Sequence, residues 1–452
     1  MSDPIILGSI AICLSAFAVC FYCGRRALWA GFLATMTVGY FYGIIRANVD
    51  NSYVHFLYDF GATGYFLALV INHKSAVQRY KLKKMMPWLV GLTAWPTLLL
   101  LAPTQNFLVQ LVGLRGHIFF LPFIAVGAMI DDREVRKIAL GLAILNCIVL
   151  VFALIEVQFG VPLFYPFNAV DQLIYRSTDV AIGGIGTFRI PATFANSAAY
   201  GGNMAGSIPL LIGGIVQERR GGWWRRLLYV AVAASAIGVF LCASRSQAAS
   251  MLIIVLAITV SGRVRNFPRF GWIAMIGFVA LVIFSSTRMQ RFLTLDNSRF
   301  VKTRVEGSVN EGLIKLAAEY PMGNGLGGGG TSMPYFLESQ VRHPVEVENE
   351  YGRIMLEQGL PGLALWIWFI MWTLTRPLPR RNEAWYLGRW LARVVLGIAF
   401  AFATTGTGLL TSIPGTAMVL FYAGWVGVPN VIRVKKRTPA RQVPAATALQ
   451  TA

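Results

Sequence analysis

Residues 138–158 decide the fold, and they read IALGLAILNCIVLVFALIEVQ. The run is apolar almost throughout and is long enough to cross ~30 Å of hydrocarbon as an α-helix. Similar runs recur along most of the chain. Helices are the expected spanning element, because an open strand or loop would leave backbone groups unpaired in lipid. A β-barrel would need segments of about 10 residues with alternating polarity, and the sequence has none.

The composition excludes a soluble domain of this length. The chain has 452 residues, of which 56% are hydrophobic and 13% charged, and its mean hydropathy is +0.59. We predict an all-α fold, a polytopic transmembrane helix bundle of about 12 to 13 spans with one long outer loop that contains short helices. With thirteen spans the N-terminus lies outside, and with twelve both ends lie inside. The predicted spans are 4–22, 27–45, 56–72, 87–102, 107–130, 138–158, 192–215, 227–243, 246–260, 270–285, 353–375, 389–409 and 412–428.

Basic residues lie in short clusters between the apolar runs. They occupy alternate gaps, and an excess of lysine and arginine marks the cytoplasmic loops of membrane proteins. The formal charge of +20 could also indicate nucleic-acid binding, but no basic, aromatic-interleaved soluble domain is present, so we expect no nucleic-acid partner. The clusters assigned to the cytoplasm are 25–26, 81–84, 133–137, 219–226, 263–269, 376–389 and 433–441.

These assignments divide the chain into six parts. They are N-terminal transmembrane helices at 1–158, an outer loop at 159–191, central transmembrane helices at 192–285, a long periplasmic or outer loop at 286–352, C-terminal transmembrane helices at 353–432, and a basic, disordered cytoplasmic tail at 433–452. Long structured loops at a membrane face usually carry function. Within the long loop the sequence predicts a helix at 305–320.

Metal, nucleotide and disulfide chemistry have little support in the sequence. The five cysteines lie within or at the ends of apolar runs, where thiols behave as small hydrophobes. The four histidines have no metal-ligand spacing. The glycine-rich run at 321–330 lacks both the preceding strand and the Gly-Lys-Ser/Thr ending of a phosphate-binding loop, so we interpret it as a flexible outer loop. We expect no metal and no cofactor.

Two arginines lie where they could bind an anion. Arg245 lies between two apolar runs with hardly any polar turn around it, and an arginine at membrane depth indicates a functional site. Arg189 lies at the outer mouth of the seventh predicted span. Two such guanidinium groups could bind a phosphate or pyrophosphate headgroup in a bidentate manner. The alternatives are a snorkelling Arg245 in a tight hairpin and a solvated charge at Arg189.

Further polar residues could contribute to the same site. Arg115 and His117 lie in the fifth predicted span and either line the cavity or form an ordinary buried hydrogen bond. In the acidic segment 342–353, a helix would place Glu346 and Glu350 on one face and Glu348 on another. A carboxylate facing a packed bundle can act as a general base. A solvated acidic helix start, favoured by the helix dipole, is the alternative.

The order of these residues resembles one family. Glu348-Asn349 stands nine residues before Gly359-Leu-Pro-Gly362, which is similar to the motif of the O-antigen ligase and O-antigen polymerase superfamily, where His-Asn precedes Gly-x-x-Gly. The resemblance covers roughly residues 185–375 and extends to Arg189 with Asn196, Ser244-Arg245-Ser246, Arg304 before the loop helix, and Pro-x-Gly-x-Gly at 321–325. The chain departs from the family at Glu348, where the ligases usually carry histidine; the nearest histidine is His343. This departure favours polymerisation, or transfer to an acceptor other than lipid A core.

The resemblance implies a metal-independent membrane glycosyltransferase at the outer face of the bacterial plasma membrane. It would transfer a glycan from a polyprenyl-pyrophosphate-linked oligosaccharide donor to a saccharide or glycolipid acceptor. Glu348 would activate the acceptor hydroxyl, with His343 as the alternative catalytic residue. The substrate-binding residues would be Arg189, Arg245, Arg115, Arg304 and Asn349. A transporter that flips lipid-linked oligosaccharides is the rival interpretation; internal repeats would favour it, and none is apparent.

Overall fold

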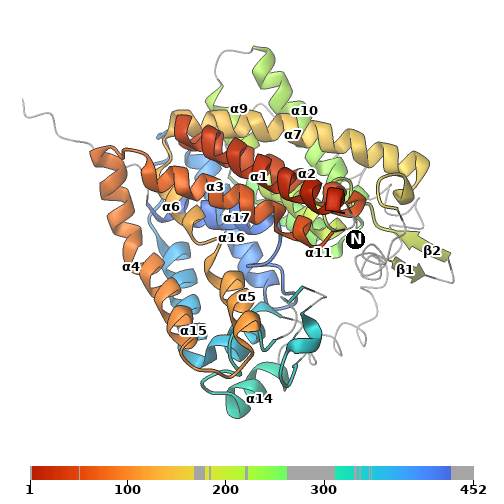
Figure 1. Cartoon of the computed structure of the whole chain (residues 1–452). Helices are drawn as coiled ribbons and strands as arrows, with labels where there is room; N and C mark the ends of the chain where they lie inside the picture. Colours follow the sequence, from red (N-terminus) through yellow and green to blue (C-terminus); the bar gives the residue numbers. More distant parts are fainter. Residues whose placement is uncertain are drawn as a thin grey trace, which may run out of the picture.

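The computed structural model describes residues 3–49, 51–166, 179–182, 185–218, 222–261, 311–329, 333–334, 337–345, 347 and 349–428. Over these residues the fold is an all-α bundle, as predicted, with one small β-hairpin (Figure 1). Eight helical stretches among the described residues are long and apolar enough to cross a membrane; two of them, Ser52–Ile71 and Phe107–Met129, each consist of two consecutive helices. Two shorter helices are also apolar. The chain is a multi-pass membrane protein.

Most helices follow the predicted apolar runs within a few residues, because the run length fixes the helix that hydrocarbon can accommodate. They are α1 (Asp3–Arg26), α2 (Leu28–Asn48), α3 (Leu57–Ile71), α4 (Ala76–Leu99), α5 (Phe107–Ile118), α6 (Pro122–Met129), α7 (Asp132–Phe159), α9 (Ser197–Gln217), α10 (Trp223–Leu241), α11 (Arg245–Val260), α14 (Glu311–Glu319), α15 (Glu350–Thr375), α16 (Tyr386–Phe402) and α17 (Gly415–Gly427). Short 3-10 helices occur at Ser52–Phe56, Val161–Leu163 and Glu338–Gln340.

Some predicted elements differ in detail. The run at 107–130 forms two helices, α5 and α6, because Pro122 begins α6 and has no N–H to continue the α5 hydrogen-bond ladder. Helix α4 begins earlier than predicted, at a capping box formed by Ser75 and Gln78. Helix α14 lies within the predicted loop helix. The predicted span at 270–285 lies outside the described residues.

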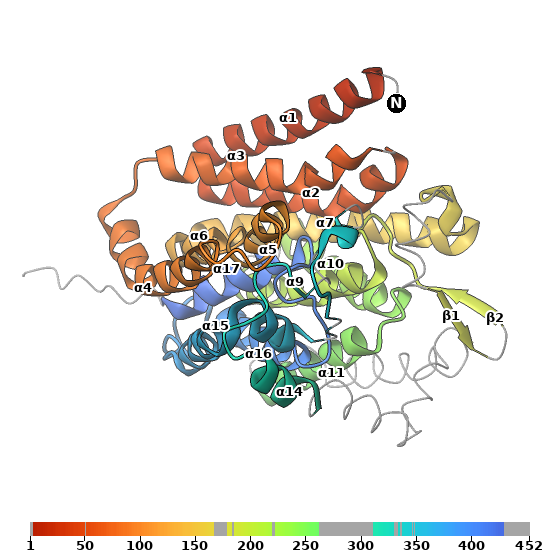
Figure 2. The same ribbon diagram turned by 60° about the horizontal axis from the view of Figure 1, so that its bottom comes forward.

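The helices pack in layers from the N-terminal hairpin to the C-terminal half (Figure 2). Helices α1 and α3 form the outer layer and pack on α2, which packs on α7. Helices α9 and α10 lie next, and α9 contacts α16 and α17. The shortest approach is between α6 and α17, where a Cβ added at Gly127 or Gly424 would lie 1.9 Å from a backbone oxygen of the other helix. Small residues allow this close backbone contact.

A polar cluster fixes the junction of four helices. The Asn146 side chain on α7 accepts a hydrogen bond from the Tyr40 hydroxyl on α2 at 2.9 Å. Its amide nitrogen donates to Ser207 on α9 at 2.7 Å and to Ser235 on α10 at 2.8 Å. These groups are buried, and the pairing satisfies a polar side chain inside the bundle.

Ion pairs join several predicted cytoplasmic gaps at one end of the bundle. We call this region the basic end, and its pairs are Lys81–Asp131 at 3.5 Å, Arg136–Glu218 at 2.6 Å and Arg389–Asp132 at 3.4 Å. The gaps that were assigned to one side from their charge therefore contact one another. Helix α9 runs from Asn196, its N-cap, to Glu218 at the basic end, a length of roughly 30 Å. Asn196 therefore lies at the other end.

The β-hairpin lies in the predicted outer loop 159–191. Strands β1 (Asp179–Ile182) and β2 (Ile185–Phe188) are antiparallel, with Asp179 opposite Phe188. The hairpin projects beside the helix bundle (Figure 2). It ends directly before Arg189, so the chain returns from the hairpin into the bundle at that residue.

Candidate functional site

A cavity of about 810 Å³ lies among α9, α11, α16 and α17 at the end of the bundle away from the basic end. Both Arg189 and Arg245 line it, although they come from separate segments of the chain. The sequence predicted that these two arginines share a site, and the structure brings them together. The cavity is large enough for part of a lipid headgroup.

Local backbone geometry places Arg245 at the cavity. Helix α10 ends at Leu241, and Ala243 takes a left-handed conformation with φ of 50°. Ser244 is the N-cap of α11, and Arg245 is the first residue of that helix. The turn is as tight as the sequence indicated, and it brings the guanidinium group to a helix N-terminus that lines the cavity. A helix N-terminus also favours a nearby anion.

Arg189 and Asn196 are brought to the cavity by the segment that precedes α9. Both line the cavity, and Asn196 is the N-cap of α9, where its side chain accepts a hydrogen bond from Ala199 N at 2.8 Å. The sequence associated these two residues by their order along the chain. The intervening segment is buried between α2 and α7.

The other residues that line the cavity are polar near Arg245 and apolar further along α11 and α16. On α11, Ser246, Ser250 and Ile254 follow one another at helical spacing, so the wall changes from polar to apolar away from Arg245. Val395, Ile398 and other apolar residues of α16 line the same cavity, as do polar residues of the loop that follows α16. The cavity therefore has a polar part that contains Arg189 and Arg245 and an apolar part deeper in the bundle. Such a cavity can hold an amphiphile with an anionic headgroup.

Arg115 does not line this cavity in the described structure, although the sequence placed it among the substrate-binding residues. Its Nε and Nη2 atoms donate to both carboxylate oxygens of Asp59 at 2.6–2.9 Å. The Arg115 side chain is 30% exposed and that of Asp59 10%. This bidentate pair lets both charges lie inside the apolar part of the protein.

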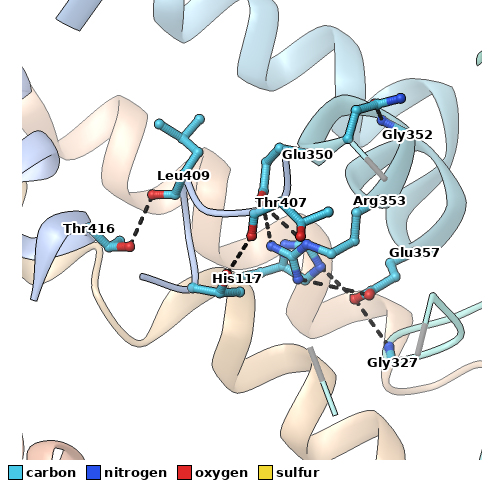
Figure 3. Close-up of polar contacts among 11 residues, drawn as sticks. His117, Gly327, Glu350, Gly352, Arg353, Glu357, Thr407, Leu409 and Thr416 are labelled. Carbon is cyan, nitrogen blue, oxygen red and sulfur yellow. Dashed lines mark hydrogen bonds and ion pairs between the residues drawn. The ribbon is translucent and has the colours of Figure 1, made fainter. Parts of the chain in front are cut away.

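Four buried charged or titratable side chains form a network beside the cavity, and Figure 3 shows how they face one another. His117 Nε2 lies 2.8 Å from Glu357 Oε2, which also accepts from Gly327 N at 3.2 Å. Arg353 lies between two carboxylates: it pairs with Glu350 through Nε and Nη2, and its Nη1 lies 3.8 Å from Glu357 Oε1. All four side chains have no exposed surface.

The network lies behind one wall of the cavity. Glu350 N donates to Ala403 O at 2.9 Å and to Gly406 O at 3.2 Å, and both of these residues line the cavity. Thr407, another lining residue, lies beside Glu350 and Arg353 (Figure 3). The solvated helix start that the sequence offered as an alternative is therefore wrong for Glu350. Among the described residues, no three carboxylate, histidine or cysteine side chains gather as metal ligands would.

The other predicted site residues lie apart from the cavity or outside the described residues. Asn349 is the N-cap of α15, where its side chain accepts from Gly352 N at 2.5 Å. His343 is exposed and has φ of 50°, and its carbonyl accepts from Asn324 Nδ2 at 3.2 Å. Glu348 and Arg304 lie outside the described residues.

The glycine-rich run is packed rather than flexible, which corrects the prediction made for it. Residues 325–329 are buried. A Cβ at Gly113 of α5 would lie 2.2 Å from Gly327 N, and Gly325 and Gly327 have φ of 89° and 79°. These positions need glycine for a left-handed backbone and for close approach to α5.

The same loop covers a break in α15. Gly359 has φ of 70° and ψ of −174°, which interrupts the helix. Asn324 N donates to Leu356 O at 2.6 Å, and Leu360 N donates to Pro321 O at 3.0 Å. The Trp95 indole donates to Gln358 O at 3.0 Å. Loop and indole therefore satisfy backbone groups that the break releases.

The sequence was compared with protein-family models and with curated proteins. No family model matches the sequence, and none of the curated proteins matches it.

Proposed function

We propose that the chain is a membrane glycosyltransferase that acts on a polyprenyl-pyrophosphate-linked oligosaccharide at the outer face of the bacterial plasma membrane, in the manner of O-antigen polymerases and ligases. The acceptor is a saccharide or glycolipid. The observation that carries the proposal is the shared cavity lined by Arg189 and Arg245, two guanidinium groups at the end of a helix bundle.

The reaction needs a stabilised leaving group. An acceptor hydroxyl oxygen attacks the anomeric carbon of the donor sugar, the bond from that carbon to the pyrophosphate oxygen breaks, and a base takes the hydroxyl proton. The departing pyrophosphate gains negative charge. Guanidinium donors fixed in a site that excludes water stabilise such charge strongly, and no metal is required for this step. In the proposal Glu348 is the base, with His343 as the alternative.

The lining of the cavity supports a lipid-linked donor. Polar residues surround the two arginines, and apolar residues of α11 and α16, such as Ile254 and Ile398, continue the wall into the bundle. A pyrophosphate would bind at the basic mouth while the first isoprenoid units contact the apolar wall. A nucleotide-linked donor has no isoprenoid chain that would contact these apolar residues.

The outer location follows from the charge of the loops. Cytoplasmic loops carry the excess of lysine and arginine, so the basic end is assigned to the cytoplasm. Helix α9 is about as long as a bilayer is thick; its C-terminus lies at the basic end and its N-terminal half lines the cavity. The cavity then opens to the outside.

Arg245 provides the sharpest test. Purified protein in lipid nanodiscs is given a lipid-linked oligosaccharide and an acceptor, and new glycosidic bonds are counted by mass spectrometry. Arg245→Ala and Arg245→Lys should both lower turnover by ~10²- to 10³-fold, since lysine keeps the charge but loses the planar fork. Arg25→Lys is the control, because Arg25 is exposed and contacts Asn72.

The rival function, flipping of the lipid-linked donor, is tested with the same protein in liposomes. A flippase would move a fluorescent donor across the bilayer and form no glycosidic bond. Normal transfer by stably inserted Arg245→Lys would remove the assigned role of that arginine. Translocation without transfer would replace the proposal by the rival.

A further inference from the structure

We propose that residues 190–195 act as a buried plug that positions Arg189 in the cavity, and that Thr193 and Glu156 are its positioning residues. This inference rests on the proposed function only in taking Arg189 as a ligand for an anionic headgroup. Neither positioning residue lines the cavity in the described structure.

The plug is irregular chain enclosed by helices. Ile190, Ala192, Thr193 and Phe194 have no exposed surface, although none of them belongs to a helix or strand. Backbone groups in such a place must find partners within the protein. The partners come from α2, from α7 and from the residues just after α7.

Thr193 makes two hydrogen bonds to the backbone of α2. Its carbonyl accepts from Ile44 N at 3.1 Å, and its hydroxyl donates to Tyr40 O. In an uninterrupted α-helix these two α2 groups pair with each other, because they are four residues apart. Thr193 therefore contacts the donor and the acceptor of one helical turn, which holds the plug at that turn of α2.

Gly43 provides the surface on which the plug rests. A Cβ at this position would lie 2.0 Å from Phe194 C and 2.2 Å from Phe194 O. The neighbouring atoms are backbone, so a side chain here could be accommodated only if the plug moved. The plug and α2 are therefore in direct backbone contact.

Glu156 holds the plug from the other side. It is fully buried near the end of α7, and its Oε2 accepts from Ala192 N at 2.8 Å. Ala192 has φ of 54°, a left-handed conformation that is rare for alanine and needs support from its surroundings. The Tyr165 hydroxyl adds contacts to Ala192 O at 2.9 Å and to Phe194 O at 2.7 Å.

The residues on either side of the plug line the cavity. Arg189 precedes it and Asn196 follows it, and both residues line the site. Contacts to α2 and α7 therefore set where the guanidinium group lies before any ligand binds. A displacement of about 1 Å of a group that acts on the reacting centre can lower turnover by ~10²-fold.

Thr193→Val tests the proposal, because valine keeps the shape of threonine and removes the hydroxyl that donates to Tyr40 O. We expect it to lower kcat at least ~10-fold and to weaken binding of farnesyl pyrophosphate in nanodiscs, while the protein stays folded. Thr193→Ser, which keeps the hydroxyl, should recover most of both. Glu156→Gln, which keeps an acceptor for Ala192 N, should be milder than Glu156→Leu. The matched control is Thr373→Val, because Thr373 is also buried and its hydroxyl donates to Phe369 O of the same helix at 2.9 Å.

A geometric measurement separates this inference from the proposed function. Cysteines at positions 189 and 245 in a cysteine-free background are joined with a short bis-maleimide, and Thr193→Val should lower the yield while Thr373→Val leaves it unchanged. If Thr193→Val and the parent protein had equal cross-linking yield and equal affinity for farnesyl pyrophosphate, the proposed positioning role of the plug would be wrong. If Thr193→Val and Thr373→Val lowered cross-linking yield and farnesyl pyrophosphate affinity equally, the proposed role of the plug would also be wrong. The parent protein could fail to bind farnesyl pyrophosphate and to transfer glycan while cross-linking still depended on Thr193. In that case the proposed function would be wrong, and the positioning role of residues 190–195 would be supported.

Discussion

Replacement of Arg353 by methionine should destabilise the protein more than any other single loss of charge in α15. Arg353 has no exposed surface and lies between Glu350 and Glu357. For unit charges 3.8 Å apart, the distance from Arg353 Nη1 to Glu357 Oε1, an effective dielectric constant of about 20 gives roughly 4 kcal/mol. Removing one partner of a buried ion pair typically costs ~3–5 kcal/mol, because the remaining charge stays desolvated.

The surface of α14 offers a control with the same geometry. Lys315 and Glu319 are also 3.8 Å apart, but their side chains are 73% and 50% exposed. Exposed pairs contribute only about 0 to 1 kcal/mol. Arg353→Met should therefore lower the unfolding midpoint of detergent-solubilised protein by several degrees, whereas Lys315→Met should leave it nearly unchanged.

A double variant identifies the cause. Glu350→Gln removes the carboxylate whose ion pair Arg353→Met breaks, so the two changes together should cost less than Arg353→Met alone. Equal midpoints for Arg353→Met and Lys315→Met, or a double variant that is worse than the sum of its parts, would show that the network does not stabilise the bundle in this way.

Two further predictions concern the side of the membrane and the base. Single cysteines at Lys315 and Asn382, in a cysteine-free background, should label oppositely with an impermeant maleimide on intact cells, with Lys315 outside; equal labelling would contradict the side assignment. Glu348→Gln should keep donor binding and lower turnover by ~10²- to 10⁴-fold, while Glu346→Gln costs much less. Full activity of Glu348→Gln together with loss of activity in His343→Ala would move the base to His343.

The helices were predictable because hydrocarbon thickness limits their length and basic loops indicate which helix ends share a side. The break between α5 and α6 was not, since Pro122 lies within a continuous apolar run and proline also occurs inside spanning helices such as α9 and α15. The shared cavity of Arg189 and Arg245 was predicted from the side of the membrane to which both were assigned.

The buried network could be predicted only in part. Glu350, Arg353 and Glu357 follow at i, i+3 and i+7, so a polar stripe at the start of α15 was visible in the sequence. The partner of Glu357, His117, lies 240 positions away, and no local spacing indicates that contact. The glycine-rich run was misinterpreted because glycine serves both flexible loops and tight backbone packing, and sequence does not separate these uses.

The break at Gly359 has a consequence for how the protein is assembled. The backbone groups that it releases are paired with Asn324, Pro321 and Trp95, so α15 has its full set of hydrogen bonds only after the preceding loop and α4 are in place. The turns of α15 on either side of Gly359 are therefore completed only when this loop and α4 are in place. The loop at 321–324 and α15 therefore have to be inherited, exchanged or redesigned together, since a foreign loop would leave unpaired backbone groups in the bundle.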